Sequence, residues 1–274
     1  MATIELNETT LYYEDTGPGS TGETIVFSHG LLWGTELFTP QIEALRERYR
    51  CIAWDHRGQG KSAADHRNSI DMELVWKDAT LMLETLGTGP VHFVGLSMGG
   101  FVGMRMAARR PELVRSLILI ETSSDPEPIE NVPKYRMLTR AVRLLGPKVV
   151  QSRVTPIMLG KTILTDASRR ADVARYSAIM ARRKDIWRAV NGVIDRAGIH
   201  DELRFIRAPT LILVGDEDVA TVPAKAEKMA NAIRGATLAH IARAGHSSTV
   251  EEPAAVTAAI ESFLRTLPPP RQMV

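Results

Sequence analysis

The sequence predicts an α/β protein in which a mostly parallel, doubly wound sheet carries one helical insertion. Short apolar runs of strand length alternate with helix-length segments over most of the chain. A Gly-x-Ser-x-Gly pattern at residues 95–99 joins one of these strands to the helix that follows it. Between residues 121 and 204 the alternation stops, and only helical patterns occur. These three observations define the expected architecture.

The expected strands begin with a hairpin. Residues 3–6 and 11–15 are short β-like runs separated by a polar turn, so we expect them to pair antiparallel. Later strands are expected at residues 24–28, 51–55, 91–94, 116–120, 208–214 and 237–242. The first of these is continuously apolar, as in strands that are buried on both faces. Helical segments between successive strands imply parallel crossovers.

The expected core helices have apolar residues at three- and four-residue spacings. They lie at residues 38–49, 75–86, 98–110, 223–233 and 253–267. The apolar stripe of the last helix is expected to consist of Val256, Ile260, Phe263 and Leu267. Prolines 268 to 270 end that helix, and we expect the tail beyond them to be disordered.

The strandless region divides the chain. Residues 1–120 and 205–274 are expected to form the core domain, and residues 121–204 a helical cap or lid. Four helices are expected in the cap, at residues 135–145, 149–159, 167–182 and 186–194. Its methionines suit either a site for varied apolar groups or packing against the sheet.

Composition excludes several classes of partner. The chain has 34 basic and 32 acidic residues, a formal charge of +2, and the basic residues look scattered. We therefore expect no nucleic-acid or membrane-surface patch. The amino terminus lacks the features of a signal peptide, and no run of roughly 18 apolar residues occurs. The expected protein is soluble and cytoplasmic, and its single cysteine, Cys51, is expected to be buried and inert.

Ser97 is the candidate nucleophile, because a strand-to-helix turn exposes its hydroxyl. A serine needs a histidine to take its proton and a carboxylate to orient that histidine. Three histidines follow Ser97 in the chain. His200 falls in the insertion and His240 in a strand, whereas His246 lies on a loop after a strand. His246 is therefore the expected base.

The candidate acid lies on the loop after residues 208–214, where Asp216 and Asp218 compete. Asp216 directly follows the strand and is better placed to bond the amides of its own turn. Asp218 projects further along the loop and is the preferred acid. Glu121 and Asp125, which follow the preceding strand, are the remaining alternatives.

An attacked carbonyl becomes an oxyanion, which needs two preorganised donors. The backbone N–H of Met98 at the helix start is one candidate, and that of Leu31 in the loop after residues 24–28 is the other. His29 is expected to hold that loop in shape. Leu32 and Trp33 are the candidates for substrate contact, although Trp33 suits packing under the cap equally well.

These residues resemble the α/β-hydrolase superfamily over nearly the whole chain outside the cap. The resemblance rests on motifs in the family's order, namely His29-Gly30, Asp55-x-Arg57-Gly58-x-Gly60-x-Ser62, Gly95-x-Ser97-Met98-Gly99-Gly100, Gly215-Asp216-Glu217-Asp218 and Gly245-His246. It implies the α/β-hydrolase fold, a triad of Ser97, Asp218 and His246, and a structural role for residues 55–62. The chain looks like the branch of small bacterial esterases, 3-oxoadipate enol-lactonases and cofactor-free perhydrolases. It differs from haloalkane dehalogenases and epoxide hydrolases, whose nucleophile is an aspartate.

The expected function is hydrolysis of a small-molecule carboxylic ester or lactone through an acyl-enzyme on Ser97. Such a reaction requires no metal and no organic cofactor. The same triad also suits a cofactor-free perhydrolase or haloperoxidase, or a hydrolase of carbon–carbon bonds. A non-catalytic small-molecule receptor is the alternative from another class, since fold alone does not fix function. The oligomeric state, a homodimer included, stays open.

Overall fold

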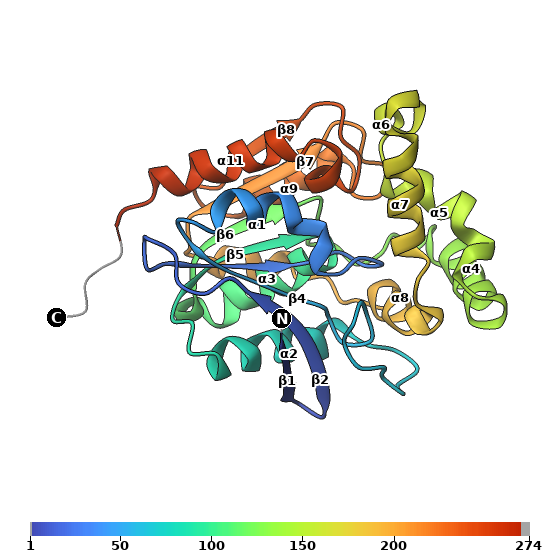
Figure 1. Cartoon of the computed structure of the whole chain (residues 1–274), viewed down its shortest axis with the longest axis horizontal. Helices are drawn as coiled ribbons and strands as arrows, with labels where there is room; N and C mark the ends of the chain where they lie inside the picture. Colours follow the sequence, from blue (N-terminus) through green and yellow to red (C-terminus); the bar gives the residue numbers. More distant parts are fainter. Residues whose placement is uncertain (1, 270–274) are drawn as a thin grey trace.

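An eight-stranded sheet runs through the centre of the computed structural model, which describes residues 2–269 (Figure 1). The strands are β1 (Ala2–Leu6), β2 (Thr9–Asp15), β3 (Thr24–Ser28), β4 (Arg50–Trp54), β5 (Val91–Leu96), β6 (Val114–Ile120), β7 (Thr210–Gly215) and β8 (Thr237–Ile241). Their order in the sheet is β1-β2-β4-β3-β5-β6-β7-β8. Strands β3 to β8 are parallel, whereas β2 pairs antiparallel with both β1 and β4. The predicted class, α/β with a mostly parallel sheet, is confirmed.

The amino-terminal hairpin turns through Asn7 and Glu8. Both residues have positive φ, 45° and 61°, although neither is a glycine. Two consecutive positive φ angles give the turn a twist that matches the twist of the flanking strands. The predicted hairpin is therefore present. The predicted disordered tail after Pro270 lies outside the described residues.

Helices cover both faces of the sheet. They are α1 (Thr39–Leu45), α2 (Met72–Thr85), α3 (Met98–Arg109), α9 (Pro223–Ala232), α10 (Ser248–Glu251) and α11 (Pro253–Thr266). Helices α2, α3 and α9 pack in one apolar layer, and α1 and α11 in the other. The helix expected at residues 38–49 is shorter than predicted, because a 3-10 turn at Thr35–Phe38 precedes α1 and the helix ends at Leu45. Among the described residues, no helix is both long enough and apolar enough to cross a membrane.

The segment between β6 and β7 is helical, and we call its residues 121–204 the cap. It contains α4 (Val132–Leu145), α5 (Gln151–Met158), α6 (Lys161–Thr165), α7 (Arg170–Met180) and α8 (Trp187–Ile194). In Figure 1 these helices form the right-hand end of the molecule, with α4 at its outer edge. No strand occurs between Ile120 and Thr210, both of which are well inside the described part of the chain.

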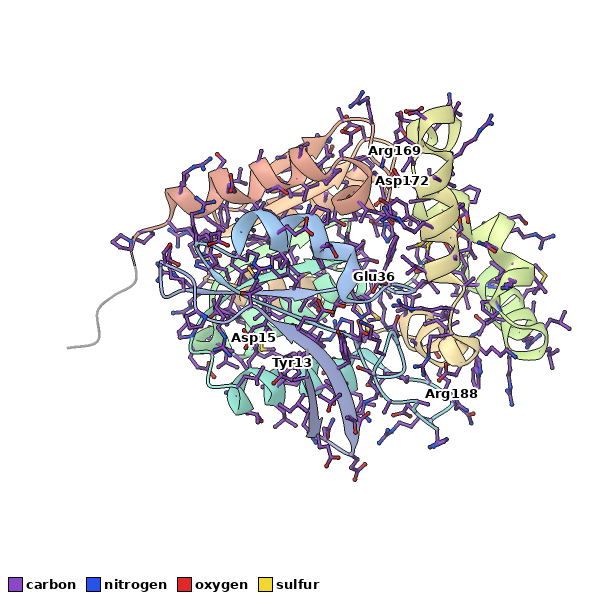
Figure 2. The ribbon with its side chains drawn as sticks, in the orientation of Figure 1. Tyr13, Asp15, Glu36, Arg169, Asp172 and Arg188 are labelled. Atoms are coloured by element: carbon purple, nitrogen blue, oxygen red, sulfur yellow. The ribbon has the colours of Figure 1, made fainter. Side chains whose placement is uncertain are left out.

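Several hydrogen bonds join the cap to the core, and two arginines of the cap supply examples on opposite sides of it. Arg169, before α7, donates to the backbone oxygens of Val250 and Glu251 at 3.3 Å each. Arg188, in α8, donates to the backbone oxygen of His66 at 2.8 Å. Figure 2 shows Arg169 and Arg188 at the two sides of the cap where it meets the core. These contacts hold α7 and α8 over the edge of the sheet.

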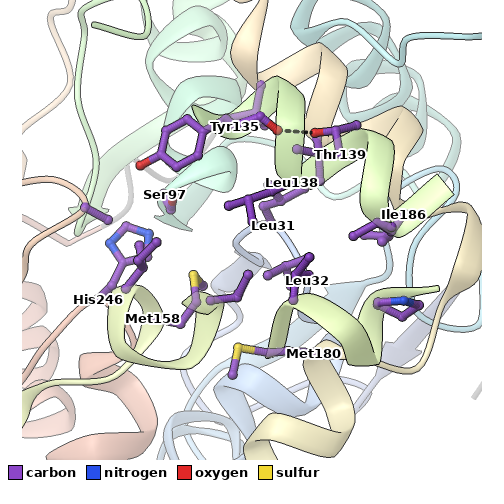
Figure 3. A pocket seen from close by; sticks show the side chains of 18 of the residues that line it. Leu31, Leu32, Ser97, Tyr135, Leu138, Thr139, Met158, Met180, Ile186 and His246 are labelled. Carbon is purple, nitrogen blue, oxygen red and sulfur yellow. Dashed lines mark hydrogen bonds between the residues drawn. The ribbon is translucent and has the colours of Figure 1, made fainter. Parts of the chain in front are cut away.

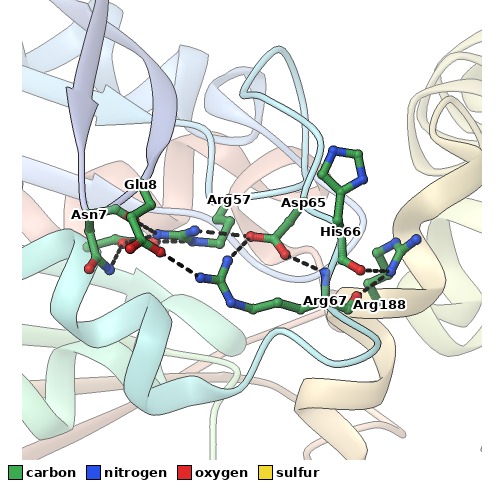
Figure 4. A network of polar contacts seen from close by, with 8 residues as sticks. Asn7, Glu8, Arg57, Asp65, His66, Arg67 and Arg188 are labelled. Carbon is green, nitrogen blue, oxygen red and sulfur yellow. Dashed lines mark hydrogen bonds and ion pairs between the residues drawn. The ribbon is translucent and has the colours of Figure 1, made fainter.

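A buried charge network supports the loop after β4 (Figure 4). The guanidinium of Arg57 is fully buried and lies 2.7 Å from Asp78 and 3.0 Å from Asp65. It also donates to the backbone oxygen of Asn7 at 2.7 Å, so the hairpin is held by the same side chain. Each charge in the network has a partner of opposite sign. The expected structural role for this loop agrees with these contacts.

Removing Arg57 should destabilise the fold strongly, because Asp78 and Asp65 would lose their shared buried cation. We expect Arg57→Met to lower the free energy of unfolding by about 3–5 kcal/mol, measured by urea denaturation. Arg67→Met is the matched control, since its side chain is 43% exposed and pairs with Asp65 at the surface. That variant should lose about 1 kcal/mol or less. Equal losses in the two variants would contradict the assignment.

Candidate active site

Ser97 lies on the sharp turn between β5 and α3. Its backbone has φ 51° and ψ −110°, a conformation that non-glycine residues rarely adopt. Two hydrogen bonds hold this strained residue: its N–H donates to the oxygen of Ile120 at 2.9 Å, and Thr122 Oγ1 donates to its oxygen at 2.8 Å. The turn directs the side chain of Ser97 away from the sheet and into a cavity beneath the cap.

The first turn of α3 lies directly against the end of β3. A Cβ on Gly99 would come 1.8 Å from the backbone oxygen of Ser28, and a Cβ on Gly95 would come 2.4 Å from the oxygen of Gly99. Real Cβ atoms do not approach backbone atoms so closely, so both positions require glycine. This close packing brings the free N–H groups at the start of α3 beside Ser97.

His246 and Asp218 meet at the edge of the sheet where β7 and β8 end. The imidazole Nδ1 lies 2.9 Å from Asp218 Oδ2, and both side chains are almost completely buried. Asp218 also accepts hydrogen bonds from the N–H groups of Ala220 and Thr221, at 2.7 and 3.0 Å, and from Thr221 Oγ1 at 2.6 Å. The carboxylate is therefore fixed in position and orients the imidazole.

The environment of Asp218 keeps it ionised. Burial alone would raise the pKa of its carboxyl group, but the charge of His246 and the hydrogen bonds from Thr221 outweigh burial and lower that pKa well below its usual value. Asp216, the competing acid, is exposed and lies 2.8 Å from Nδ1 of His240. Asp125 pairs with Lys228 at 2.6 Å. Of the four carboxylates considered from the sequence, only Asp218 forms a hydrogen bond with His246 within residues 2–269.

Ser97 and His246 line the same cavity, and Figure 3 shows them at one end of it. Within the described chain, no hydrogen bond engages Ser97 Oγ, and those of His246 involve only Nδ1. The Nε2 atom of His246 is thus available to a group in the cavity. Hydrogen bonds between catalytic groups are often long before substrate binds.

The loop after β3 carries Leu31, whose N–H is the second expected oxyanion donor. Throughout residues 2–269, no hydrogen bond uses the N–H of Leu31 or of Met98. Leu32 has a strained φ of 75°, and its N–H donates to the buried side chain of Gln59 at 3.1 Å. Gln59 also contacts Met98 Sδ at 3.5 Å, so it links the two segments that carry the expected donors. Gln59 lies in residues 55–62, for which the sequence predicted only a structural role, and it was not singled out there.

His29 holds the same loop from beneath. Its Nε2 accepts a hydrogen bond from the N–H of His56 at 2.9 Å, which leaves Nδ1 to donate to the oxygen of Gly30 at 2.7 Å. Burial lowers the pKa of His29 to about 3. The imidazole is therefore neutral near pH 7 and acts as a fixed support, as its position in the sequence predicted.

The cavity encloses about 170 Å³ and is lined mainly by apolar residues of the cap. Its lining includes Leu32, Leu138, Val142, Val154, Met158 and Met180. Leu32 thus contacts the cavity as predicted. Trp33 does not line it: the indole is buried and packs edge-on against Tyr176 of α7, with ring centroids 5.6 Å apart. The assignment of Trp33 to substrate contact is therefore replaced by packing under the cap, the alternative that the sequence left open.

Two further buried carboxyl groups lie behind the His246 loop. Glu121, at the end of β6, is fully buried, and both its oxygens lie 2.9 Å from the N–H of Gly215. Burial and then the negative charge of Asp218 raise the pKa of Glu121 well above its usual value. The sequence analysis considered Glu121 only as an alternative acid. Its position after an apolar strand was the available signal.

Glu251 joins the His246 loop to the cap. Its carboxyl oxygens accept hydrogen bonds from Gly245 and Ser247, on either side of His246, at 3.1 and 2.9 Å. They also accept one from Gly160 of the cap at 2.7 Å. The sequence analysis missed this residue, because its partners include a glycine 91 positions away in the chain.

A family model, curated relatives and solved structures are all similar to this chain over most of its length. The family model described as alpha/beta hydrolase fold matches residues 23–253. A protein of Variovorax paradoxus named "Putative carbamate hydrolase RutD" is 28% identical over 95% of this chain and 98% of its own. A thermophilic esterase from Thermogutta terrifontis superposes with a TM-score of 0.87 at 28% identity, covering 96% of both chains. The enol-lactonase from Burkholderia xenovorans superposes equally well at 25% identity, over 96% of this chain and all of its own.

Glu121→Gln should stabilise the protein increasingly as pH rises. The pKa of Glu121 is raised in the folded chain, whereas in the unfolded chain it is about 4.3. Between these two pKa values the folded chain binds a proton that the unfolded chain has lost. The free energy of unfolding of the wild type therefore falls as pH rises through this range. Glutamine keeps the neutral form at every pH. Urea unfolding should be measured at several pH values between about 4.5 and 8. The free energy of unfolding of the variant minus that of the wild type should increase with pH, by at most about 1.4 kcal/mol per pH unit. A difference that does not change with pH would contradict the raised pKa assigned to Glu121.

Proposed function

Because the chain belongs to the alpha/beta hydrolase family, we propose that it is a serine hydrolase that cleaves a carboxylic ester or lactone through an acyl-enzyme on Ser97. One observation carries this proposal. His246 Nδ1 lies 2.9 Å from the ionised Asp218, and the imidazole borders the same cavity as the strained Ser97. The family alone would leave the reaction open, since function depends on the site.

The proposed reaction begins with attack by Ser97 Oγ on the carbonyl carbon. His246 Nε2 takes the hydroxyl proton as the new bond forms, and Asp218 stabilises the resulting imidazolium. The N–H groups of Leu31 and Met98 bind the oxyanion of the tetrahedral intermediate. His246 then gives the proton to the leaving alcohol. Water, activated by the same imidazole, hydrolyses the acyl-enzyme and restores the serine.

The shape and chemistry of the cavity suggest the kind of substrate. Its apolar walls favour an uncharged chain or ring, and an apolar cavity of about 150 Å³ is known to hold a benzene ring. The proposed substrate therefore carries an apolar group of roughly six carbon atoms. Near the reacting end, Tyr135 lines the cavity and its hydroxyl points toward Ser97 and His246 in Figure 3. It is the polar group best placed to contact an ester oxygen.

Ser97→Ala should abolish turnover if this proposal is right. The three residues act as a unit, so we expect kcat for p-nitrophenyl hexanoate to fall on the order of 10⁴-fold or more. Ser177→Ala is the matched control, because it removes a hydroxyl from another wall of the same cavity. That variant should keep kcat within about tenfold of the wild type. Substantial activity in Ser97→Ala would exclude the acyl-enzyme mechanism.

The choice of acid is tested by the pair Asp218→Asn and Asp216→Asn in the same assay. The first change removes the charge next to His246 and should lower kcat on the order of 10³-fold to 10⁴-fold. The second makes the same change on an exposed side chain that bonds His240, and should have little effect. The reverse result would assign the role to Asp216. Running the assay with a lactone, a carbamate and added hydrogen peroxide separates the related reactions.

The length of the substrate's acyl chain should control kcat/KM. Each methylene buried in the cavity contributes about 0.8 kcal/mol, or roughly fourfold in kcat/KM, until the cavity is filled. In a series of p-nitrophenyl esters, we expect kcat/KM to rise from acetate to about hexanoate and then to fall. Leu138→Trp, which fills the cavity, should move the optimum to shorter chains. Leu144→Trp is the control on the outward side of the same helix, and a shift in that variant would contradict the assignment of the pocket.

A further inference from the structure

The cap carries a strong local charge that the overall balance conceals. Residues 131–165 contain seven lysines and arginines and no aspartate or glutamate. The chain as a whole has a formal charge of only +2, which is why the basic residues looked scattered in the sequence. In the structure, five of the seven belong to α4 and to the turn Pro147–Val150 that follows it: Lys134, Arg136, Arg140, Arg143 and Lys148.

The same part of the cap exposes large apolar side chains. Leu144 is 80% exposed and Leu145 72%, and Met137 and Val149 are each more than half exposed. We call the set Lys134, Met137, Arg140, Arg143, Leu144, Leu145, Lys148 and Val149 the α4 outer face. Figure 1 shows α4 at the extreme end of the molecule, farthest from the core. Exposed apolar groups that gather in one place mark an interaction site.

The spacing of residues in α4 explains why both faces are apolar. Leu138 and Val142 are four apart, line the cavity and face inward. Met137 and Leu144 are seven apart and share the opposite side, with Arg140 between them. Leu145 is the last residue of α4 and lies seven residues after Leu138, but it is still 72% exposed. Neither Arg140 nor Arg143 has an acidic partner among residues 2–269, although the guanidinium carbon of Arg143 lies 4.8 Å from the centre of the Trp187 ring. Together with Arg136 and Trp187, these two arginines line a surface hollow beside the apolar residues.

We propose that the α4 outer face docks on an anionic phospholipid surface. Leucine side chains flanked by unpaired arginines and lysines match the chemistry of a phospholipid boundary, where acyl chains lie next to phosphate groups. A second copy of this chain is disfavoured as the partner. A symmetric dimer through this face would place its cations against an identical set, and like charges across an interface are repulsive.

Docking in this orientation would place the cavity one helix away from the lipid. The inner side of α4 lines the cavity, and its outer side would rest on the membrane. An apolar ester dissolved in the bilayer would then have to pass only α4 to reach the cavity. The docking surface itself does not depend on the proposed hydrolysis, since none of its residues lines the cavity.

Vesicle flotation of the full-length protein tests the proposal. We expect the protein to float with vesicles of equal parts phosphatidylcholine and phosphatidylglycerol at about 0.1 M salt. Binding should be much weaker to phosphatidylcholine alone, and also at about 1 M salt. Arg140→Gln/Arg143→Gln should weaken binding by about 30-fold. Leu144→Ser/Leu145→Ser should weaken it by at least about tenfold.

The matched control is Arg204→Gln/Phe205→Ser. These residues form another exposed pair of a cation and an apolar ring, with the guanidinium carbon 4.9 Å from the ring centre, but they lie outside the α4 outer face. This variant should bind like the wild type. All three variants should keep the far-ultraviolet circular dichroism spectrum and the Tm of the wild type, which shows that they are folded whether or not the protein hydrolyses esters.

Four results would overturn the proposal. They are absence of binding to the mixed vesicles at low salt, equal binding to both vesicle types, equal loss in the Arg204/Phe205 control, and unchanged binding after Leu144→Ser/Leu145→Ser. The last would mean that charge alone is recognised. A concentration-dependent dimer in size-exclusion chromatography that Leu144→Ser/Leu145→Ser dissociates would assign this face to a second copy of the chain instead.

Discussion

The close contact between the start of α3 and the end of β3 is the constraint on which the site depends. The backbone at Gly99 lies so near the oxygen of Ser28 that no side chain fits between them. This contact fixes the N-terminal turn of α3 next to the loop that continues from β3, in which a Cβ on Gly30 would lie 3.5 Å from the Cβ of Ser97. A larger residue at position 99 would move the helix away from the strand. The strained turn, the helix start and the donor loop would then separate together.

The electrostatics around His246 depend on three buried carboxyl groups, whose pKa values are shifted in different directions by their surroundings. Asp218 receives hydrogen bonds and faces the imidazole, so its pKa is lowered. Glu121 and Glu251 are buried without a cation in contact, and burial raises the pKa of both. Burial disfavours the ionised form of all three carboxyl groups, and only Asp218 has contacts that more than offset burial. Glu121, whose pKa is raised, supports the loop by accepting the N–H of Gly215.

The sequence predicted those features that depend on local pattern. Alternating strands and helices gave the class, and the carboxyl ends of parallel strands brought loops distant in sequence to one edge, where Asp218 meets His246. Features set by pairing across the chain were not accessible. Trp33 packs on Tyr176 rather than on the cavity, and Glu251 binds an amide far away in the cap. In the last helix the predicted Phe263 packs partly buried against the core, and Leu264, which was not predicted, is buried beside it. Both positions continue the apolar stripe, and only packing decides how deeply each is buried.

The contacts of the cap also indicate which wall of the cavity is free to move. Arg169 ties the start of α7 to the core, Arg188 ties α8, and Gly160 before α6 is bound to Glu251. The side chains of α4, in contrast, form their hydrogen bonds to other parts of the cap, as Arg136 does to Asn191. A wall held only by packing and by contacts within the cap can shift without breaking the bonds that position His246. Since the same helix has an apolar outer face, whatever covers that face also acts on the least constrained boundary of the cavity.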